Sequence, residues 1–345
     1  MTSDRRLLGI WSLRGWGVGL FSLPIHMCYF AMGYMLLRGV PRPSLLDLLL
    51  LVLCFELYFA YGVIVNDLFD RQVDIAAGKS SPKRGHTLTE RELGLLLALL
   101  LLSSLVLVAA IGGGPVFDTL WALAFALATL YSAPPARLRA RGFLGLVADS
   151  LIEKPLPVLI VFSLFGYYGP EAFLFAACAE LMDSVFKHQV EDYDLDTKVG
   201  MRTFAVALGR ERSDSAVQAI VHPLNILAVA ALVATALFFL PGVRLFTSAS
   251  VAILLLGLGA TVFLERRGRM RQGFPFQDPP VVGYLDFSFR AFFLGGLALG
   301  LAVAQPGFAL LSLLILFSIA VYLKGFARLF PDLFRYAASG APAGG

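Results

Sequence analysis

The feature that most constrains this chain is a series of apolar segments, each long enough to cross a bilayer, divided by short polar connectors. A helix needs about 20 apolar residues to cross the hydrocarbon core of a membrane. Hydrophobic residues make up 58% of the chain, charged residues only 15%, and the mean hydropathy is +0.77. This composition excludes an ordinary soluble domain, and no period in the apolar pattern suggests strands. The sequence therefore predicts an all-α fold, a polytopic transmembrane helical bundle.

We predict nine to ten membrane spans. The last two are divided only by "AQPG", so the break at 305–307 is either a turn or a kink within one long helix. We expect a single integral-membrane domain over residues 1–345, with a core at about 15–300 and an extra C-terminal hydrophobic segment at about 305–324. The predicted spans are 18–37, 45–65, 92–111, 116–131, 144–165, 172–186, 216–240, 246–264, 287–304 and 307–323.

The positions of the basic residues predict the topology, because Lys and Arg in short connectors stay on the cytoplasmic side. Of 28 basic residues, the connectors assigned to the outside hold only Arg38, Arg42 and Arg244. The net charge of +4 then reflects topology and attraction to anionic lipid, and no nucleic-acid partner is expected. We expect an integral protein of the cell inner membrane, with both termini and the loops at 66–91, 132–143, 187–213 and 265–286 in the cytoplasm.

An acidic motif, "NDLFDRQVD" at residues 66–74, follows the second predicted span. On a helix, Asp67, Asp70 and Asp74 share one face, and Asn66 is a neighbour of Asp70. The simple alternative is a polar loop beside a membrane, where aspartate is common. A bare cluster of carboxylates would repel itself, however, whereas hard divalent cations bind carboxylate oxygens and bridge them to phosphates.

A second acidic motif, "HQVEDYDLDTKVGMRT", follows the sixth predicted span. Asp192, Asp196 and Gly200 recur at steps of four residues, with Glu191 and Asp194 beside them. Both motifs lie on the predicted cytoplasmic side, as if a unit of four spans had been used twice. Two facing carboxylate clusters suit one diphosphate held through Mg²⁺ ions.

Together these motifs resemble those of the UbiA superfamily of intramembrane prenyltransferases, and the resemblance covers about residues 15–300. The connector "YSAPPARLRARG" at 131–142 is similar to the basic, proline-containing connector of the family, whose members usually have nine spans. The family pattern N-D-x-x-D-x-x-x-D is matched by Asn66, Asp67, Asp70 and Asp74. Its second pattern, D-x-x-x-D followed by glycine and threonine, is matched by Asp192, Asp196, Gly200 and Thr203.

The resemblance implies an Mg²⁺-dependent prenyltransferase that ionises an allylic isoprenyl diphosphate and transfers the prenyl group to an acceptor. The implied partners are the isoprenyl diphosphate, a lipophilic or aromatic acceptor and membrane lipid. The expected metal ligands are Asn66, Asp67, Asp70, Asp74, Asp192 and Asp196. The expected catalytic residues are Asp67, Asp70, Asp192, Asp196 and Arg137.

Departure of pyrophosphate requires positive charge near the leaving group, which metal ions and basic side chains supply in a water-poor site. The alternative is that the basic residues near the two motifs serve only to set the membrane topology. Arg71 could equally pair with a carboxylate of its own motif. The residues expected to bind substrate are Asn66, Arg71, Tyr131, Arg139, Glu153, Lys154, Lys198 and Arg202.

Charged residues inside predicted spans are costly and mark either a site or a buried pair. Lys154 either neutralises Glu153 or Glu180 as a structural pair, or belongs to an acceptor site in which an acid orients or deprotonates the acceptor. The following "PLP" should distort the fifth helix. The charges concerned are Glu56, Asp149, Glu153, Lys154, Glu180 and Asp183.

Two other functions remain compatible with the residues. A UbiA-type terpene cyclase, in which the isoprenoid chain captures its own cation, would use the same metal site and release pyrophosphate without an acceptor. A transporter should concentrate carboxylates near the membrane midplane, whereas the densest clusters here lie at predicted cytoplasmic helix ends. Acceptor identity, prenyl chain length and oligomeric state are not encoded in the motifs.

Overall fold

A computed structural model describes residues 9–40, 43–76, 81–240, 244–266 and 280–327 of the chain. Within these residues the regular structure is helical, which confirms the predicted all-α fold. The helices are α2 (Val18–Phe21), α3 (Leu23–Arg38), α4 (Leu45–Phe69), α5 (Arg71–Ala76), α6 (Glu90–Ile111), α7 (Pro115–Ser132), α8 (Phe143–Glu153), α9 (Pro155–Leu164), α10 (Pro170–Met182), α11 (Val185–Glu191), α12 (Tyr193–Lys198), α13 (Phe204–Leu208), α14 (Arg210–Ala216), α15 (His222–Phe239), α16 (Arg244–Arg266), α17 (Pro280–Ser288), α18 (Leu294–Ala304) and α19 (Ala309–Ala327). Two π-helical turns, Val217–Val221 and Phe289–Phe293, join α14 to α15 and α17 to α18.

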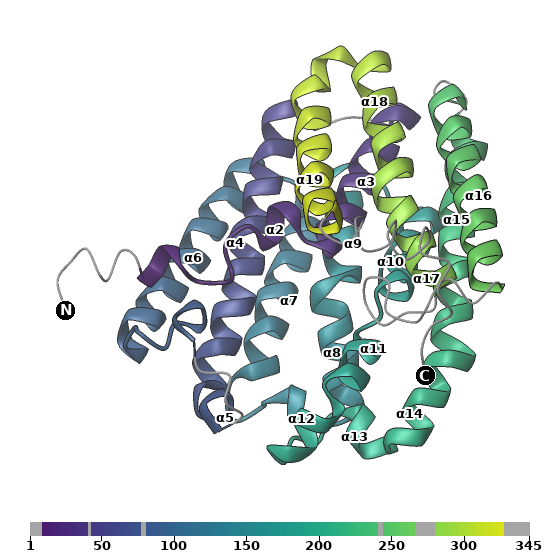
Figure 1. The fold of residues 1–345 in the computed structure, drawn as a ribbon. Helices are drawn as coiled ribbons and strands as arrows, with labels where there is room; N and C mark the ends of the chain where they lie inside the picture. Colours follow the sequence, from purple (N-terminus) through teal and green to yellow (C-terminus); the bar gives the residue numbers. More distant parts are fainter. Residues whose placement is uncertain (1–8, 41–42, 77–80, 241–243, 267–279, 328–345) are drawn as a thin grey trace.

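The long helices form a bundle, and short helices gather at one of its ends (Figure 1). Helix α4 packs against α2, α6 and α7, while α3 packs against α9 and α18. Helices α5, α12 and α13 lie together at the lower end of the view in Figure 1. The two acidic motifs therefore lie at the same end of the bundle, since α5 carries the end of the first motif and α12 belongs to the second.

Local capping explains where two of the long helices begin. The Ser44 hydroxyl accepts a hydrogen bond from the Asp47 N–H, and the Asp47 carboxylate accepts one from the Ser44 N–H. Thr89 and Glu92 make the same reciprocal pair before α6. Each pair satisfies N–H groups that have no partner inside the helix, so α4 and α6 have defined first turns.

The outer surface of the bundle is apolar. Helix α6 exposes a run of leucines and valines along its outward face, and such a surface suits lipid rather than water. Six helical segments are long and apolar enough to cross a membrane, and the chain is an integral membrane protein. These segments are Leu45–Phe69, Glu90–Ile111, Pro115–Ser132, Arg210–Phe239, Val282–Ala304 and Pro306–Lys324. The exposed residues of α6 include Leu95, Leu99, Leu102, Leu105 and Val106.

Several predicted spans are not single long helices. The span predicted at 18–37 is divided into α2 and the 16-residue α3, the span at 144–165 is broken in its middle, and the span at 172–186 is broken near its end. The break at 305–307 is a turn: α18 ends at Ala304, and α19 returns beside it (Figure 1). Hydropathy alone did not indicate the breaks near Ser22 and at Asp183, because the residues on both sides remain apolar. The predicted cytoplasmic termini and most of the 265–286 loop lie outside the described residues.

Two helix breaks face each other inside the bundle. Helix α8 ends at Glu153 because Lys154 leaves the helical conformation and Pro155 begins α9, which confirms the predicted distortion. Helix α10 ends at Met182, and Asp183 leaves the helical conformation (φ −148°, ψ 65°) before α11. The Lys154 ammonium donates a hydrogen bond to the Asp183 carbonyl, and the Asn225 amide donates one to the Met182 carbonyl at 2.7 Å. Side chains thus satisfy carbonyls that the break removes from the helix.

Glu56, a charge within α4, binds the chain segment that precedes α3. Its carboxylate accepts a hydrogen bond from the Gly17 N–H at 2.6 Å and lies beside the backbone of Gly19. A Cβ atom at Gly19 would overlap the backbone of Phe55 and Glu56. Glycine at position 19 therefore permits the close approach of α2 to α4 that brings backbone donors to the buried acid.

We expect Gly19→Val to lower the free energy of unfolding by about 1–3 kcal/mol, because a side chain there forces α2 away from α4. The measurement is unfolding of the purified protein in detergent by heat or denaturant. Gly94→Val is the matched control, since no atom lies near a Cβ at that helical position, and its effect should stay within about 0.5 kcal/mol. Equal stability of the two variants would contradict the close packing of α2.

Candidate active site

The first acidic motif lies where α4 gives way to α5. Asn66 and Asp67 occupy the last turn of α4, Asp70 follows its final residue, and Asp74 lies in α5. Asp67, Asp70 and Asp74 are all buried. The helical spacing predicted for the motif is therefore retained across the junction, and it brings three buried carboxylates to one end of the bundle.

Arginines outside the motif neutralise two of these acids. Arg14 binds Asp67 through both ends of its guanidinium, with Nε at 3.0 Å from Oδ2. Arg84 binds Asp74 at 2.6 Å and lies 3.7 Å from Asp67. Because an isolated cluster of buried carboxylates would repel itself, these pairs stabilise the junction between α4 and α5.

The connector at 131–142 supplies the partners of Asp70. Arg137 lies 3.3 Å from Asp70 Oδ1, and the Arg139 guanidinium forms an ion pair with Oδ2. Arg139 also donates a hydrogen bond to Asn66 Oδ1 at 3.2 Å, and the Ser132 hydroxyl donates one to the same oxygen at 2.7 Å. The connector thus contacts the first motif directly.

The second motif runs from the end of α11 through α12. Asp192 is exposed between the two helices, whereas Asp196 is buried. Gly200 has φ +71°, a left-handed conformation that suits glycine. Thr203 forms an isolated bridge with Gly142, so the end of the second motif is attached to the connector that carries Arg137 and Arg139.

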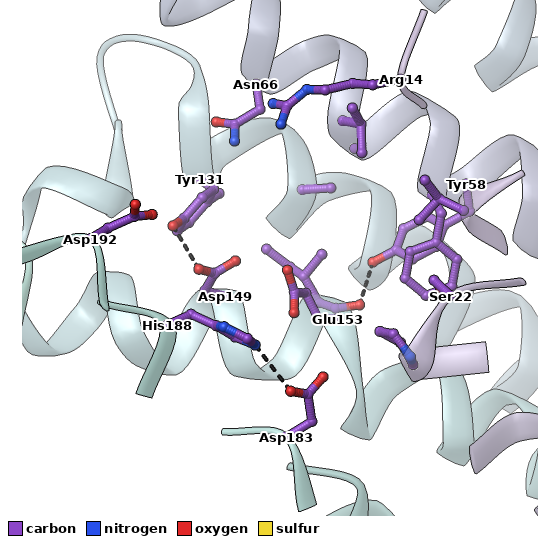
Figure 2. Close-up of a pocket in the computed structure, with 17 residues that line it drawn as sticks. Arg14, Ser22, Tyr58, Asn66, Tyr131, Asp149, Glu153, Asp183, His188 and Asp192 are labelled. Carbon is purple, nitrogen blue, oxygen red and sulfur yellow. Dashed lines mark hydrogen bonds and ion pairs between the residues drawn. The ribbon is translucent and has the colours of Figure 1, made fainter. Parts of the chain in front are cut away.

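Two neighbouring cavities join the motifs. The larger, about 540 Å³, has a mostly apolar wall from α2, α3, α4, α7 and α8. The smaller, about 230 Å³, is more polar and is bordered by Arg139, Asp196 and Thr203 among others. Figure 2 shows the polar residues of the larger cavity. The residues that line both are Asn66, Tyr131, Asp149, Glu153, His188 and Asp192.

Polar contacts fix the cavity wall formed by α8 and α11. The Tyr131 hydroxyl donates a hydrogen bond to Asp149 at 2.7 Å (Figure 2). Lys154 Nζ lies 3.3 Å from Glu153 and 3.8 Å from Asp183. Only 1% of the Lys154 side chain is exposed. The Lys154 ammonium lies between two carboxylates, so the charged groups at the helix breaks are paired with one another inside the bundle.

His188 is held between two carboxylates. One ring nitrogen lies 3.0 Å from Asp183 and the other 3.3 Å from Glu191. Hydrogen bonds from the ring to these two acids raise the pKa of His188 to about 10. At neutral pH His188 is therefore an imidazolium that donates from both nitrogens, and it brings positive charge to the border of both cavities.

Other predicted binding residues occupy different environments. Arg71 donates hydrogen bonds to the carbonyls of Leu88 at 2.9 Å and His86 at 3.1 Å, so its guanidinium holds the loop before α6. Lys198 and Arg202 are exposed near the second motif. The backbone carbonyl of Arg202 accepts the Gly142 N–H, which again attaches the motif to the connector.

Sequence patterns did not identify Arg14 or His188 as site residues. Arg14 is 53 residues from its partner Asp67 in the sequence. The sequence shows it only as a basic residue before the first apolar segment. His188 is adjacent to the second motif, but its position in the cavity depends on the break at Asp183. The pairings of Arg14 with Asp67 and of His188 with Asp183 have no helical spacing that could predict them.

Among the residues that the structure describes, no group of three or more His, Cys, Asp or Glu side chains is arranged to hold a metal ion. The donor chemistry nevertheless fits Mg²⁺, because Asn66, Asp192 and Asp196 bring oxygen ligands to one polar cavity. Mg²⁺ commonly takes only a few protein oxygens and completes its shell with water and substrate phosphates. Of the six predicted metal ligands, these three meet at one cavity that could also hold a phosphate-bearing ligand. Asp67, Asp70 and Asp74 line neither cavity and instead form ion pairs with arginines.

The fold and site define a class: a helical integral membrane protein in which acid-bearing helix ends border a cavity that continues between the helices. The model of the UbiA prenyltransferase family matches residues 27–276, and the chain belongs to that family. The comparison with curated proteins found no match.

Solved structures support the assignment of the fold. The chain is similar to a UbiA homolog from Archaeoglobus fulgidus bound to DMAPP and Mg²⁺, with 20% identity and a TM-score of 0.53, covering 88% of this chain and 99% of that one. The structure of a UbiA homolog from the same organism bound to GPP and Mg²⁺ gives the same identity, coverage and TM-score. At this level of identity the similarity concerns the fold.

We expect Lys154→Met to lower the free energy of unfolding by about 3–5 kcal/mol, because it leaves Glu153 and Asp183 without their shared cation. Lys83→Met, at an exposed lysine, should change it by less than about 0.5 kcal/mol. Denaturation in detergent, followed by circular dichroism, compares the two variants. If Lys154→Met proves as stable as Lys83→Met, Lys154 does not hold the broken helices together.

Proposed function

We propose that this protein is an Mg²⁺-dependent intramembrane prenyltransferase that ionises an allylic isoprenyl diphosphate and transfers the prenyl group to an aromatic or other membrane-associated acceptor. The observation that carries the proposal is the junction of both acidic motifs at one cavity, bordered by Asn66, Asp192 and Asp196. This polar cavity shares its wall with a larger apolar one. A diphosphate head needs a polar cavity, and an isoprenoid tail needs an apolar cavity next to it.

The acidic residues of the two motifs would hold the metal. When bound, Mg²⁺ neutralises the diphosphate and stabilises the negative charge that develops on pyrophosphate as it leaves. The UbiA homolog structures bound to DMAPP or GPP with Mg²⁺ support the choice of ligand and metal. The proposed ligands are Asn66, Asp67, Asp70, Asp74, Asp192 and Asp196.

Arginines of the connector would bind the diphosphate. Arg137 and Arg139 already lie against Asp70, and a guanidinium fork that binds a carboxylate also binds phosphate oxygens. Arg137 is proposed to act on the leaving group, and the exposed Lys198 and Arg202 to attract the diphosphate to the opening. The contacts of Arg71 with loop carbonyls favour an indirect role, in which it positions the loop that contains Arg84.

The larger cavity would hold the isoprenoid tail away from water. Its wall includes Tyr58, Phe59 and Val63 of α4. Apolar walls exclude water, which would otherwise capture the allylic cation, and aromatic faces stabilise positive charge. The chain's own residues therefore bind the tail, exclude solvent and leave the reactive carbon near the polar cavity.

The same proposal includes the orientation in the cell. We infer that the end of the bundle with α5 and α12 faces the cytoplasm of the inner membrane, because the connectors at that end, 66–91, 132–143 and 187–213, are rich in basic residues. A water-soluble diphosphate head would then reach the site from the cytoplasm while its tail lies between the helices.

We expect Asp192→Ala to reduce Mg²⁺-dependent turnover at least a hundredfold, since a proposed metal ligand is lost while the exposed side chain contributes little to folding. Asp194→Ala is the matched control: its carboxylate is 89% exposed and faces Arg210 rather than the cavity, so turnover should change less than threefold. The assay incubates purified protein, Mg²⁺ and labelled allylic diphosphates with candidate acceptors, and identifies products by mass spectrometry. Near-normal activity of Asp192→Ala would refute its metal role, and pyrophosphate release that needs no acceptor would favour a cyclase.

A further inference from the structure

Asp149 and Glu153 lie where the polar and apolar cavities meet. Both residues line the larger and the smaller cavity. They are four residues apart on α8, so they share one face of that helix. Figure 2 shows their carboxylates side by side, both directed into the cavity. A diphosphate in the smaller cavity with its tail in the larger would place its reactive carbon next to this pair.

The two acids differ in their partners. Asp149 accepts a hydrogen bond from the Tyr131 hydroxyl at 2.7 Å, which fixes its orientation. Glu153 lies 3.3 Å from the Lys154 ammonium, but 41% of its side chain is exposed, against 1% of the Lys154 side chain. Lys154 is not among the residues that line either cavity. The Glu153 carboxylate is thus available to a ligand in the cavity, whereas the Lys154 ammonium lies outside the cavity lining.

The cations that border the larger cavity are each bound to acids. Arg14 holds Asp67 at the opening, and His188 lies between Asp183 and Glu191. Asp149 and Glu153 on α8, together with Asp183 and Asp192, therefore make this side of an otherwise mostly apolar cavity acidic. A carboxylate on a ligand would meet like charge there, in surroundings that screen charge poorly.

We propose that Asp149 and Glu153 form the acceptor site and restrict the acceptor to a neutral or cationic molecule that offers a hydroxyl or amine hydrogen. This inference rests on the proposed prenyl transfer. The hydroxyl or amine donates to Glu153 and faces the reactive carbon, whereas an acceptor that carries its own carboxylate is repelled.

The step balances without a further reactant. The bond between C1 of the prenyl group and the diphosphate oxygen breaks, and pyrophosphate leaves with that electron pair. The acceptor oxygen or nitrogen forms the new bond to C1, and its proton passes to the Glu153 carboxylate. Asp149, oriented by Tyr131, accepts a second hydrogen bond and positions the acceptor.

Binding without Mg²⁺ or diphosphate tests the inference directly. Radiolabelled 4-hydroxybenzamide and 4-hydroxybenzoate, and decanol and decanoate, are two matched pairs that differ chiefly in charge. We expect the neutral member of each pair to bind at least ten times more tightly. Glu153→Gln should reduce this ratio below threefold, whereas Asp118→Asn, at an exposed carboxylate in the first turn of α7, should leave it unchanged.

Equal or tighter binding of the carboxylated compounds, or failure of both neutral compounds to bind, would overturn the acceptor assignment. A ratio that Glu153→Gln leaves intact would overturn the role of Glu153. The proposed prenyl transfer is judged separately, from Mg²⁺-dependent pyrophosphate release by wild-type protein with allylic diphosphates of several chain lengths. Release accompanied by a preference for carboxylated acceptors refutes only the acceptor inference, while absence of release with every acceptor refutes the transferase.

Discussion

The site depends on one buried ammonium that joins two broken helices. In lipid, a helix can be interrupted only where other groups satisfy the freed backbone and any charge. Lys154 meets both needs, since it donates to the Asp183 carbonyl and lies near the Glu153 and Asp183 carboxylates. Asp183 in turn binds His188. The same contact therefore fixes the α8 and α11 walls of the cavity relative to each other.

The second constraint on the site is a set of ion pairs between arginines and the acids of the first motif. Asp67, Asp70 and Asp74 are buried close together, and each has an arginine within 3.3 Å. Because one guanidinium fork fits either a carboxylate or a phosphate, such pairs can stabilise the opening without ligand and rearrange toward a diphosphate. Arg137 and Arg139, for which a purely topological role was the alternative explanation, are partners of the acidic motif.

The sequence revealed the helical class, six of the long helices and the two motifs, because each has a local period or spacing. It also predicted the break before "PLP", since proline cannot continue a helix. It did not predict the break at Asp183, which has no proline, or the pairing of Arg14 with Asp67. Those features depend on contacts between residues far apart in the chain, and the printed sequence has no periodic signal for them.

Glu56 illustrates how a charge inside a span can act on a cavity that it does not line. It holds the backbone at Gly17, and the following residues Val18 and Ser22 form part of the wall of the larger cavity. The close approach at Gly19 keeps this segment against α4. The width of the apolar cavity is thus set partly by a hydrogen bond outside it. The free-energy cost of burying the Glu56 carboxylate in the membrane is offset by hydrogen bonds from backbone N–H groups, which would otherwise have no partner in lipid.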